Sequence, residues 1–324
     1  MVADSPPVAH LSDGHRPPGR FADLAFRWVA LLAGLSVLVV LALIAFSTTH
    51  EAWPAFSKEG IHFFTSKRWD VPGQHFGALA FIAGTLLVSA IALFFAVPVS
   101  IGIALFITEV VPRRLRRSIV YVVDLLAAVP SVVYGLWGAT VLAPKSTGFY
   151  DNVARTFRSV PILHTLLSGQ PVSGVSYMTA GVIVALMITP IITSITREVF
   201  ATVPTSQKEA ATALGATRWE MIRGSVFPHS RGGIVGAVLI GLGRAMGETI
   251  AVALVVGSAT SLTGRLFSPG DTMAAVIANQ FGEATDTYRA ALVGLGVVLF
   301  AITIVIGVIA RAFVARADAR SAGA

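Results

Sequence analysis

Six long apolar stretches run through this chain and constrain what it can fold into. They occupy residues 28–46, 77–108, 119–143, 177–195, 232–256 and 290–310. An apolar helix needs about 20 residues to cross the hydrocarbon core of a membrane. Stretch 77–108 is too long for one perpendicular span and too short for two, so we interpret it as one tilted or bent helix. The sequence therefore predicts an all-α polytopic membrane protein with six transmembrane helices.

Composition supports a membrane protein and excludes several other classes. Of the 324 residues, 55% are hydrophobic and only 13% are charged, whereas soluble domains are about a quarter charged. The absence of cysteine rules out disulfides and Cys-ligated metals. The seven histidines are scattered without metal-ligand spacing, so no metal site is expected. The net charge of +7 does not indicate a nucleic-acid partner, because the basic residues cluster at the ends of apolar stretches.

The distribution of Lys and Arg predicts the orientation. If the six stretches all cross, 15 basic residues lie on the side of both termini and eight on the other. The positive-inside rule then places both termini in the cytoplasm. The first stretch is long enough to span, so it is interpreted as a retained anchor. The predicted segments are a disordered cytoplasmic tail (1–22), a first helix with its outer loop (23–76), a helical core (77–312) and a cytoplasmic tail (313–324).

The segment between the fourth and fifth stretches has the signals of two short helices. Ser206 and Glu209 form a capping-box pattern, and Thr217 and Glu220 form a second one. Gly215 stands between them, where a helix-ending glycine is expected. The second helix is predicted to stop near Pro228. The result is an exposed helix–glycine–helix loop, which is either a plain connector capped by Glu209 or a docking element for another protein.

Two charged residues interrupt the fifth stretch. Arg244 and Glu248 are the only charged residues in 232–256, and a central charge costs roughly 2.5–3.5 kcal/mol on membrane-insertion scales. Their spacing of four places them on one face of a continuous helix. Gly243 and Gly247 favour close approach of another helix. Two interpretations remain: a substrate pathway, or an ion pair that stabilises the helix bundle.

Two further groups are candidates for a gate and an outer mouth. Pro130, Ser131 and Tyr134 combine a kink with hydroxyl groups in the third stretch, which suits either a gate hinge or plain packing. Gln280 precedes the sixth stretch and is a candidate contact at the outer mouth. Asp271 is a candidate cap of a short helix nearby.

The loop between the fourth and fifth stretches resembles the EAA loop of ABC importer permeases. Glu209-Ala210-Ala211 is followed by Gly215 and, thirteen residues later, by Pro228. The family pattern has Ile and Leu three and one residues before the proline, where this chain has Ser225 and Phe227. Further matching segments extend the likeness to the phosphate-specific, PstC-type permeases over about residues 75–312: 128–138, 197–200, 213–220, 241–249 and 277–283.

The resemblance implies a MetI-like permease fold and a bacterial inner-membrane location. It also implies a second permease subunit, a dimer of cytoplasmic ATPase subunits and a soluble phosphate-binding protein. No phosphate-binding P-loop is present, so ATP is expected on the partner ATPase, with no cofactor on this chain and no enzymatic activity of its own. The implied substrate-pathway residues are Arg244, Glu248 and Thr249. The implied ATPase-coupling residues are Glu209, Ala210, Ala211, Gly215, Trp219, Glu220 and Pro228, within a coupling loop over 197–231.

The sequence leaves three other functions open. A permease for another oxyanion, such as sulfate or molybdate, would also use an intramembrane Arg. An ion-coupled carrier acting alone often shows paired repeats with broken helices, and no such repeat is visible here. A membrane enzyme would need a nucleophile and base, and no pattern indicates them. The predicted function is the permease subunit of an ATP-driven phosphate importer working by alternating access.

Overall fold

A computed structural model describes residues 20–168 and 173–322 of the chain. Residues 1–47 and 48–324 form two compact units, and each is described by itself. Most of the predicted tail (1–22) lies outside the described residues, and helix α1 (Arg20–Glu59) already begins at Arg20. In the first unit this helix carries the apolar stretch 28–46, which agrees with a membrane-spanning helix.

Five helices of the described chain are long and apolar enough to cross a membrane, and a bent helix pair makes a sixth candidate. The prediction of six spans is confirmed in this sense. The second stretch forms one span, as predicted, through α3 (Leu79–Leu105) and the π-helical turn η1 (Phe106–Val110). The fourth and sixth stretches lie in α8 (Tyr177–Ala201) and α14 (Asp286–Ala322). Helix α14 continues through most of the segment predicted as a C-terminal tail (313–324).

The third span is not one straight helix. Helix α4 (Arg113–Ala127) is followed by helix α5 (Ser131–Trp137), and the chain bends by 82° between α4 and the helical segment Ser131–Thr156 that begins with α5. Pro130 lies at the break, because it has no N–H to donate and disfavours helical angles in the residue before it. After α5 the chain continues through η2 (Gly138–Leu142) into α6 (Ala143–Thr156), followed by α7 (Pro161–Leu167).

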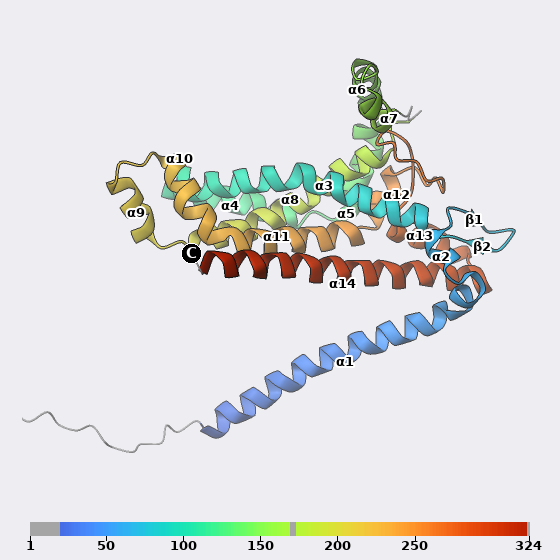
Figure 1. Ribbon diagram of the computed structural model, residues 1–324, viewed down its shortest axis with the longest axis horizontal. Coiled ribbons are helices and arrows are strands. Elements are labelled where there is room, and N and C mark those ends of the chain that lie inside the picture. The colour runs from blue at the N-terminus through green and yellow to red at the C-terminus, as the bar shows by residue number, and fades with distance from the viewer. Residues whose placement is uncertain (1–19, 169–172, 323–324) are drawn as a thin grey trace, which may run out of the picture. The chain divides into compact units, whose positions relative to one another are not determined.

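The centre of the second unit is the packing of α3 against α8. Val88 and Ile91 of α3 pack with Ile183 and Ile188 of α8, and all four are buried. Gly181 allows this approach, since a Cβ atom there would overlap Ile91. Figure 1 shows α3, α8 and α14 running alongside α11 (Phe227–Gly247).

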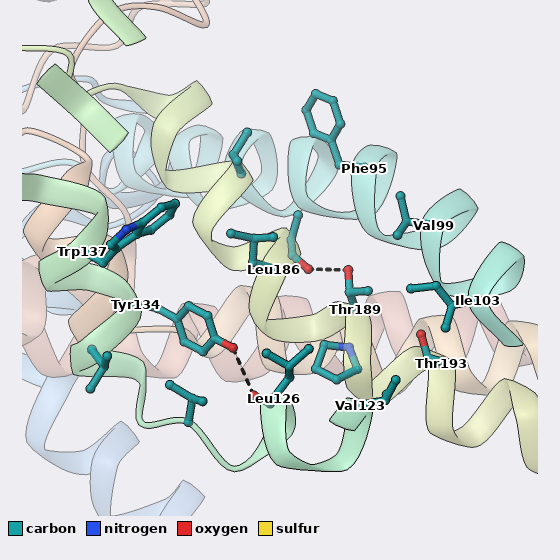
Figure 2. A pocket seen from close by; sticks show the side chains of 15 residues that line it. Phe95, Val99, Ile103, Val123, Leu126, Tyr134, Trp137, Leu186, Thr189 and Thr193 are labelled. Atoms are coloured by element: carbon teal, nitrogen blue, oxygen red, sulfur yellow. Dashed lines mark hydrogen bonds between the residues drawn. The ribbon is translucent and has the colours of Figure 1, made fainter. Parts of the chain in front are cut away.

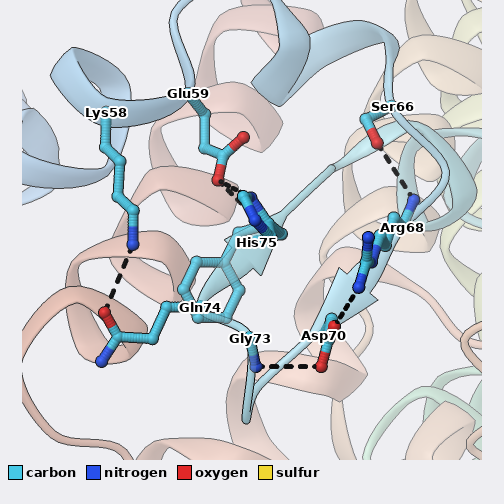
Figure 3. A network of polar contacts seen from close by, with 9 residues as sticks. Lys58, Glu59, Ser66, Arg68, Asp70, Gly73, Gln74 and His75 are labelled. Atoms are coloured by element: carbon cyan, nitrogen blue, oxygen red, sulfur yellow. Dashed lines mark hydrogen bonds and ion pairs between the residues drawn. The ribbon is translucent and has the colours of Figure 1, made fainter.

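A short β-hairpin lies at one end of this unit. Strands β1 (Trp69–Asp70) and β2 (His75–Phe76) pair antiparallel, next to helix α2 (His62–Thr65). Polar contacts fasten the hairpin: Lys58 to Gln74, Glu59 to His75, and Arg68 to Asp70 (Figure 3). Figure 1 shows this hairpin at the end opposite to α9 (Thr205–Ala213) and α10 (Arg218–Met221). The sequence analysis did not predict these strands.

The chain between α11 and α14 contains two short helices. The first, α12 (Ile250–Val255), follows α11 after a break. The second, α13 (Met273–Gln280), leads through the turn η4 (Phe281–Glu283) into α14. The cap of α13 was predicted wrongly: Thr272, and not Asp271, accepts the hydrogen bond from the backbone N–H of Ala275, at 3.3 Å.

Candidate functional site

The predicted helix–glycine–helix loop is present, and we call residues 204–228 the docking loop. Helix α9 ends before Gly215, whose φ of +84° favours glycine. Nothing lies within 4 Å of a Cβ built at Gly215, so the turn needs glycine for its backbone angles and not for space. The chain reverses direction at this glycine turn, and α9 and α10 lie at the same end of the unit (Figure 1).

One of the two predicted capping boxes is confirmed and the other is wrong. The backbone N–H of Thr217 donates to the carboxylate of Glu220 at 2.8 Å, and the Glu220 N–H donates back to the Thr217 hydroxyl at 3.3 Å. At α9, however, Pro204 is the N-cap and no side chain caps the helix. The reason is that helical geometry already begins at Thr205, so Ser206 is inside the helix.

The second helix of the docking loop does not stop at Pro228. Helix α10 continues through the π-helical turn η3 (Ile222–Val226) into α11, and Pro228 lies in the first turn of α11. Within this uninterrupted run Pro228 is an interior residue, which has no N–H to donate to the preceding turn and directly follows the π-helical turn η3 and Phe227. The docking loop and the fifth span are therefore one connected helical path, Arg218–Gly247.

The docking loop exposes most of the residues predicted to couple to the ATPase. Glu209, Ala210, Gly215, Trp219, Glu220 and Pro228 are exposed, and Ala211 is half-buried. Leu214 was not predicted as a contact, yet it is 90% exposed, and Trp219 is 60% exposed. A hollow of about 470 Å³ lies beside Leu214, between α9 and the start of α11. Exposed large apolar side chains around a hollow are typical of a protein contact surface.

The fifth span is broken at the predicted substrate-pathway residues. Helix α11 ends at Gly247, Glu248 has extended backbone angles, and α12 begins at Ile250. Arg244 is exposed in the last turn of α11. The expectation that Arg244 and Glu248 share a helix face is therefore wrong. The sequence analysis missed this break because it interpreted Gly247 as a helix-packing residue, although glycine also commonly ends a helix.

The three residues at the break have different surroundings. The Glu248 carboxylate accepts a hydrogen bond from the Ala251 N–H at 3.4 Å, and the Thr249 hydroxyl donates to the carbonyl of Gly247 at 2.9 Å. Among the described residues, no acidic side chain pairs with Arg244. Non-helical backbone inside a span occurs where it is covered by protein or lines a water-filled cavity. An unpaired guanidinium there is a candidate anion ligand.

The glycines of α11 divide between two faces. Gly233 and Gly241 pack against α8, where a Cβ atom would collide with Val199 and Ile192. Gly243 and Gly247 have nothing within 4 Å. The close approach predicted at this second pair is therefore not made within the described chain, and the face that carries Arg244 is open.

The three predicted gate residues do not share one environment. Pro130 and Ser131 form the start of α5. The Tyr134 hydroxyl donates to the Leu126 carbonyl at 3.0 Å, across the bend between α4 and α5. Tyr134 also faces a groove of about 790 Å³ that is lined almost wholly by apolar side chains of α3, α4, α5 and α8 (Figure 2). An apolar groove cannot solvate an anion, so this groove is not an anion path.

The predicted mouth residue Gln280 has a partner within the chain. Its side-chain oxygen accepts a hydrogen bond from the Tyr288 hydroxyl at 2.6 Å. Asp271, in the loop before α13, is 1% exposed, and its Oδ2 has no hydrogen-bond partner among the described residues. Burial raises the pKa of Asp271 to about 7, although the Thr272 N–H opposes this. The sequence analysis missed this buried carboxyl, because an Asp before a short helix usually signals an exposed cap.

Comparison with known proteins gives a consistent result. Residues 96–322 match the family described as binding-protein-dependent transport system inner membrane component. The chain is 46% identical to the phosphate transport system permease protein PstC of Mesorhizobium japonicum, over 93% of each chain. It is 40% identical to the protein of that name from Haemophilus influenzae (90% of this chain, 92% of the other). For PstC 2 of Mycobacterium tuberculosis the identity is 41% (91% and 92%).

Solved structures show the same fold. A bacterial ABC transporter involved in the import of the acidic polysaccharide alginate matches with a TM-score of 0.56 at 19% identity, covering 91% of this chain and 98% of that one. The MetNI methionine ABC transporter in an inward-facing conformation matches with a TM-score of 0.53 at 15% identity, covering 77% and 99%. At these identities the likeness concerns the fold alone.

Proposed function

The chain belongs to the binding-protein-dependent transport system inner membrane component family, and from this premise we propose that it is the permease subunit of an ATP-driven importer of inorganic phosphate. The observation that carries the substrate is the likeness to three phosphate transport permeases at 40–46% identity over almost the whole chain. The prediction of a permease and not an enzyme is confirmed by this family membership.

The orientation follows from the basic residues. With 15 Lys and Arg on the side of both termini and eight on the other, both termini and the docking loop face the cytoplasm. The β1–β2 hairpin then faces the outside. The chain is accordingly a multi-pass inner-membrane protein whose docking loop is accessible to cytoplasmic partners.

Arg244 is the proposed phosphate ligand. A guanidinium offers several N–H donors in one plane and forms strong charge-assisted hydrogen bonds with oxyanions. Arg244 suits this role because it is exposed and no carboxylate of the described residues neutralises it. Glu248 and Thr249, at the break that follows, lie on the same path. A carboxylate at Glu248 accepts a hydrogen bond from a protonated phosphate oxygen, which sulfate lacks at neutral pH.

The partners follow from the exposed surfaces. The docking loop presents Leu214 and Trp219 to a dimer of cytoplasmic ATPase subunits. The open glycine face of α11 meets a second permease, which completes the path around Arg244. A soluble phosphate-binding protein delivers the anion from outside. ATP binds to the ATPase subunits and not to this chain, which carries no P-loop sequence.

Reconstitution tests this proposal directly. The complete complex is placed in proteoliposomes with ATP inside and the phosphate-loaded binding protein outside. We expect ATP-dependent uptake of labelled phosphate. Excess unlabelled phosphate should abolish this uptake, whereas excess sulfate or molybdate should leave it unchanged. Competition by sulfate would instead assign a different oxyanion. Uptake by this chain alone, without ATP, would indicate a carrier and would refute the proposal.

A further inference from the structure

Helix α9 lies against α10 and η3 of its own loop, and two of its positions are partly covered. Of its nine residues, only Lys208 and Ala211 are partly covered, and the other seven are exposed. Lys208 and Ala211 are three residues apart, so they lie on one helix face. Ala211 contributes a methyl group to a small apolar cluster that includes Ala104 and Phe200. Lys208 makes the polar contact.

That contact is a partly buried ion pair with a distant part of the chain. The Lys208 Nζ lies 2.5 Å from Oε1 of Glu109, which is 99 residues away in sequence. The side chains are 21% and 8% exposed, respectively. A pair this sheltered is little screened by salt, and removal of one partner leaves a buried charge without compensation. Most exposed ion pairs, in contrast, contribute little.

Glu109 lies in a structurally distinct place, the π-helical turn η1 at the end of span α3. This turn ends the span; π-helical turns occur at helix C-termini, and the described chain has two others, η2 and η3. The same turn is held from the other side, because the Arg116 guanidinium of α4 donates to the carbonyl of Thr108 at 2.5 Å. The turn therefore connects α9, α3 and α4.

The connections of α9 determine which membrane spans follow a movement of the docking loop. Along the chain, α9 follows α8 and precedes α11. Among the contacts of the described residues, the Lys208–Glu109 pair joins it to η1 at the end of α3, and the apolar cluster around Ala211 joins it to Ala104 of α3. Helix α3 packs on α8 along most of its length. A movement of α9 must therefore be transmitted to both α3 and α8 if these two helices are to move together.

We propose that the Lys208–Glu109 ion pair is a strut that couples the docking helix α9 to span α3, and that it stays closed throughout the transport cycle. Both are positioning residues: neither contacts the substrate path or ATP. The inference rests on the proposed function, because it gives a role to ATPase movement. Without the strut, α9 follows the ATPase while α3 lags behind, and ATP is hydrolysed with little transport.

The first experiment measures the ratio of phosphate transported to ATP hydrolysed in the reconstituted complex. We expect Glu109→Gln and the doubly uncharged Glu109→Gln/Lys208→Met to lower this ratio at least about tenfold, in line with the strength of a charged hydrogen bond, while ATP hydrolysis persists. The exchanged pair Glu109→Lys/Lys208→Glu restores it. Arg68→Gln is the matched control, since it breaks an ion pair of equal length, 2.5 Å, that is exposed in the hairpin.

The doubly uncharged variant separates coupling from simple destabilisation. If the pair matters only because an unpaired buried charge disturbs folding, Glu109→Gln/Lys208→Met transports with the normal ratio, and the strut is refuted. A normal ratio in Glu109→Gln refutes it as well. If the unaltered complex takes up no phosphate, the proposed function fails, and that failure is visible before any variant is tested.

A second measurement needs no substrate. The chain has no cysteine, so spin labels attach only at introduced sites, here Gly102→Cys on α3 and Thr212→Cys on α9, both exposed. In the complex we expect one narrow distance distribution that is the same with and without ATP. Glu109→Gln broadens it or makes it depend on ATP. A distribution that changes with ATP in the otherwise unaltered protein would show that the pair opens, and would overturn the inference.

Discussion

Arg244 and Glu248 are separated by the end of a helix, although they are only four residues apart. Arg244 lies in the last turn of α11, which stops at Gly247, and Glu248 has extended backbone angles. Glu248 instead accepts a hydrogen bond from the Ala251 N–H at the start of α12. No ion pair joins Arg244 and Glu248 in the structure of residues 20–168 and 173–322.

Replacement of Arg244 tests its role in phosphate transport. We expect Arg244→Gln to lower uptake by about tenfold or more, because a hydrogen bond to a charged group contributes about 1.5–3 kcal/mol. Arg244→Lys keeps the charge but loses the planar fork, so its uptake is intermediate. The measurement is initial uptake of labelled phosphate at equal amounts of assembled complex. Uptake of Arg244→Gln equal to that of the unaltered complex would remove Arg244 from the pathway.

Exchange of the two charges tests their independence. Because the residues are not paired, Arg244→Glu/Glu248→Arg is expected to transport no better than Arg244→Glu alone. A double-mutant cycle on uptake measures the interaction between the two positions. Recovery of transport in the exchanged variant would mean that the residues pair during the cycle, as the simple helical spacing suggests.

Leu214 tests the docking surface. It is 90% exposed, so Leu214→Asp is expected to leave the thermal stability of the permease unchanged. A charge at the centre of an apolar contact should nevertheless weaken binding of the ATPase by tenfold or more. Copurification of ATPase subunits and a thermal melt of the permease together give both readouts. Normal ATPase binding would move the contact away from Leu214.

Asp271 predicts a particular dependence of stability on pH. Burial raises its pKa from 3.8 to about 7 in the folded protein. Between these two values the folded state holds a proton that the unfolded state has lost, so stability falls as pH rises from about 4 to 7 and is then constant. Each unit of pKa difference corresponds to about 1.4 kcal/mol.

The change Asp271→Asn removes this titration. We expect thermal melts between pH 5 and pH 8 to show a decline in the unaltered protein and a flatter profile in Asp271→Asn, which is the more stable of the two at pH 8. Asp70→Asn is the control, because the pKa of Asp70 is lowered and its titration lies outside this range. Equal slopes in all three proteins would mean that Asp271 is charged in the folded state.

Two glycines predict contrasting effects of an added methyl group. At Gly135, a Cβ atom would lie 2.8 Å from the Cα of Ala251 in α12, so Gly135→Ala has to displace backbone at a cost of about 1–3 kcal/mol. At Gly215 the added atom meets nothing, and the cost is about 1–2 kcal/mol from the positive φ alone. Thermal melts measure the two costs, and Gly135→Ala should in addition impair uptake, because the displaced helix α12 follows directly after Glu248.

Much of the architecture follows from the sequence because it depends on local properties. The length of each apolar stretch predicts a span, and the Thr217–Glu220 capping box and Gly215 predict the turn of the docking loop from interactions within a few residues. These signals do not depend on the remainder of the chain. The same reasoning identified Arg244 and Glu248 as charged residues whose insertion into a membrane costs free energy, without showing how their side chains are arranged.

The tertiary structure decided what local signals leave open. The fifth span breaks after Gly247 and not at the equally spaced Gly243, and the path from Arg218 continues past Pro228, although a proline usually ends a helix. Glu109 and Lys208 form an ion pair although 99 residues separate them in the sequence, and no pattern in either segment predicts this pair. Such features depend on which surfaces pack together, and packing energy is distributed over many distant contacts. The sequence alone thus determined where the membrane spans and the docking loop lie, whereas only the folded chain decided which charged groups pair and which remain free.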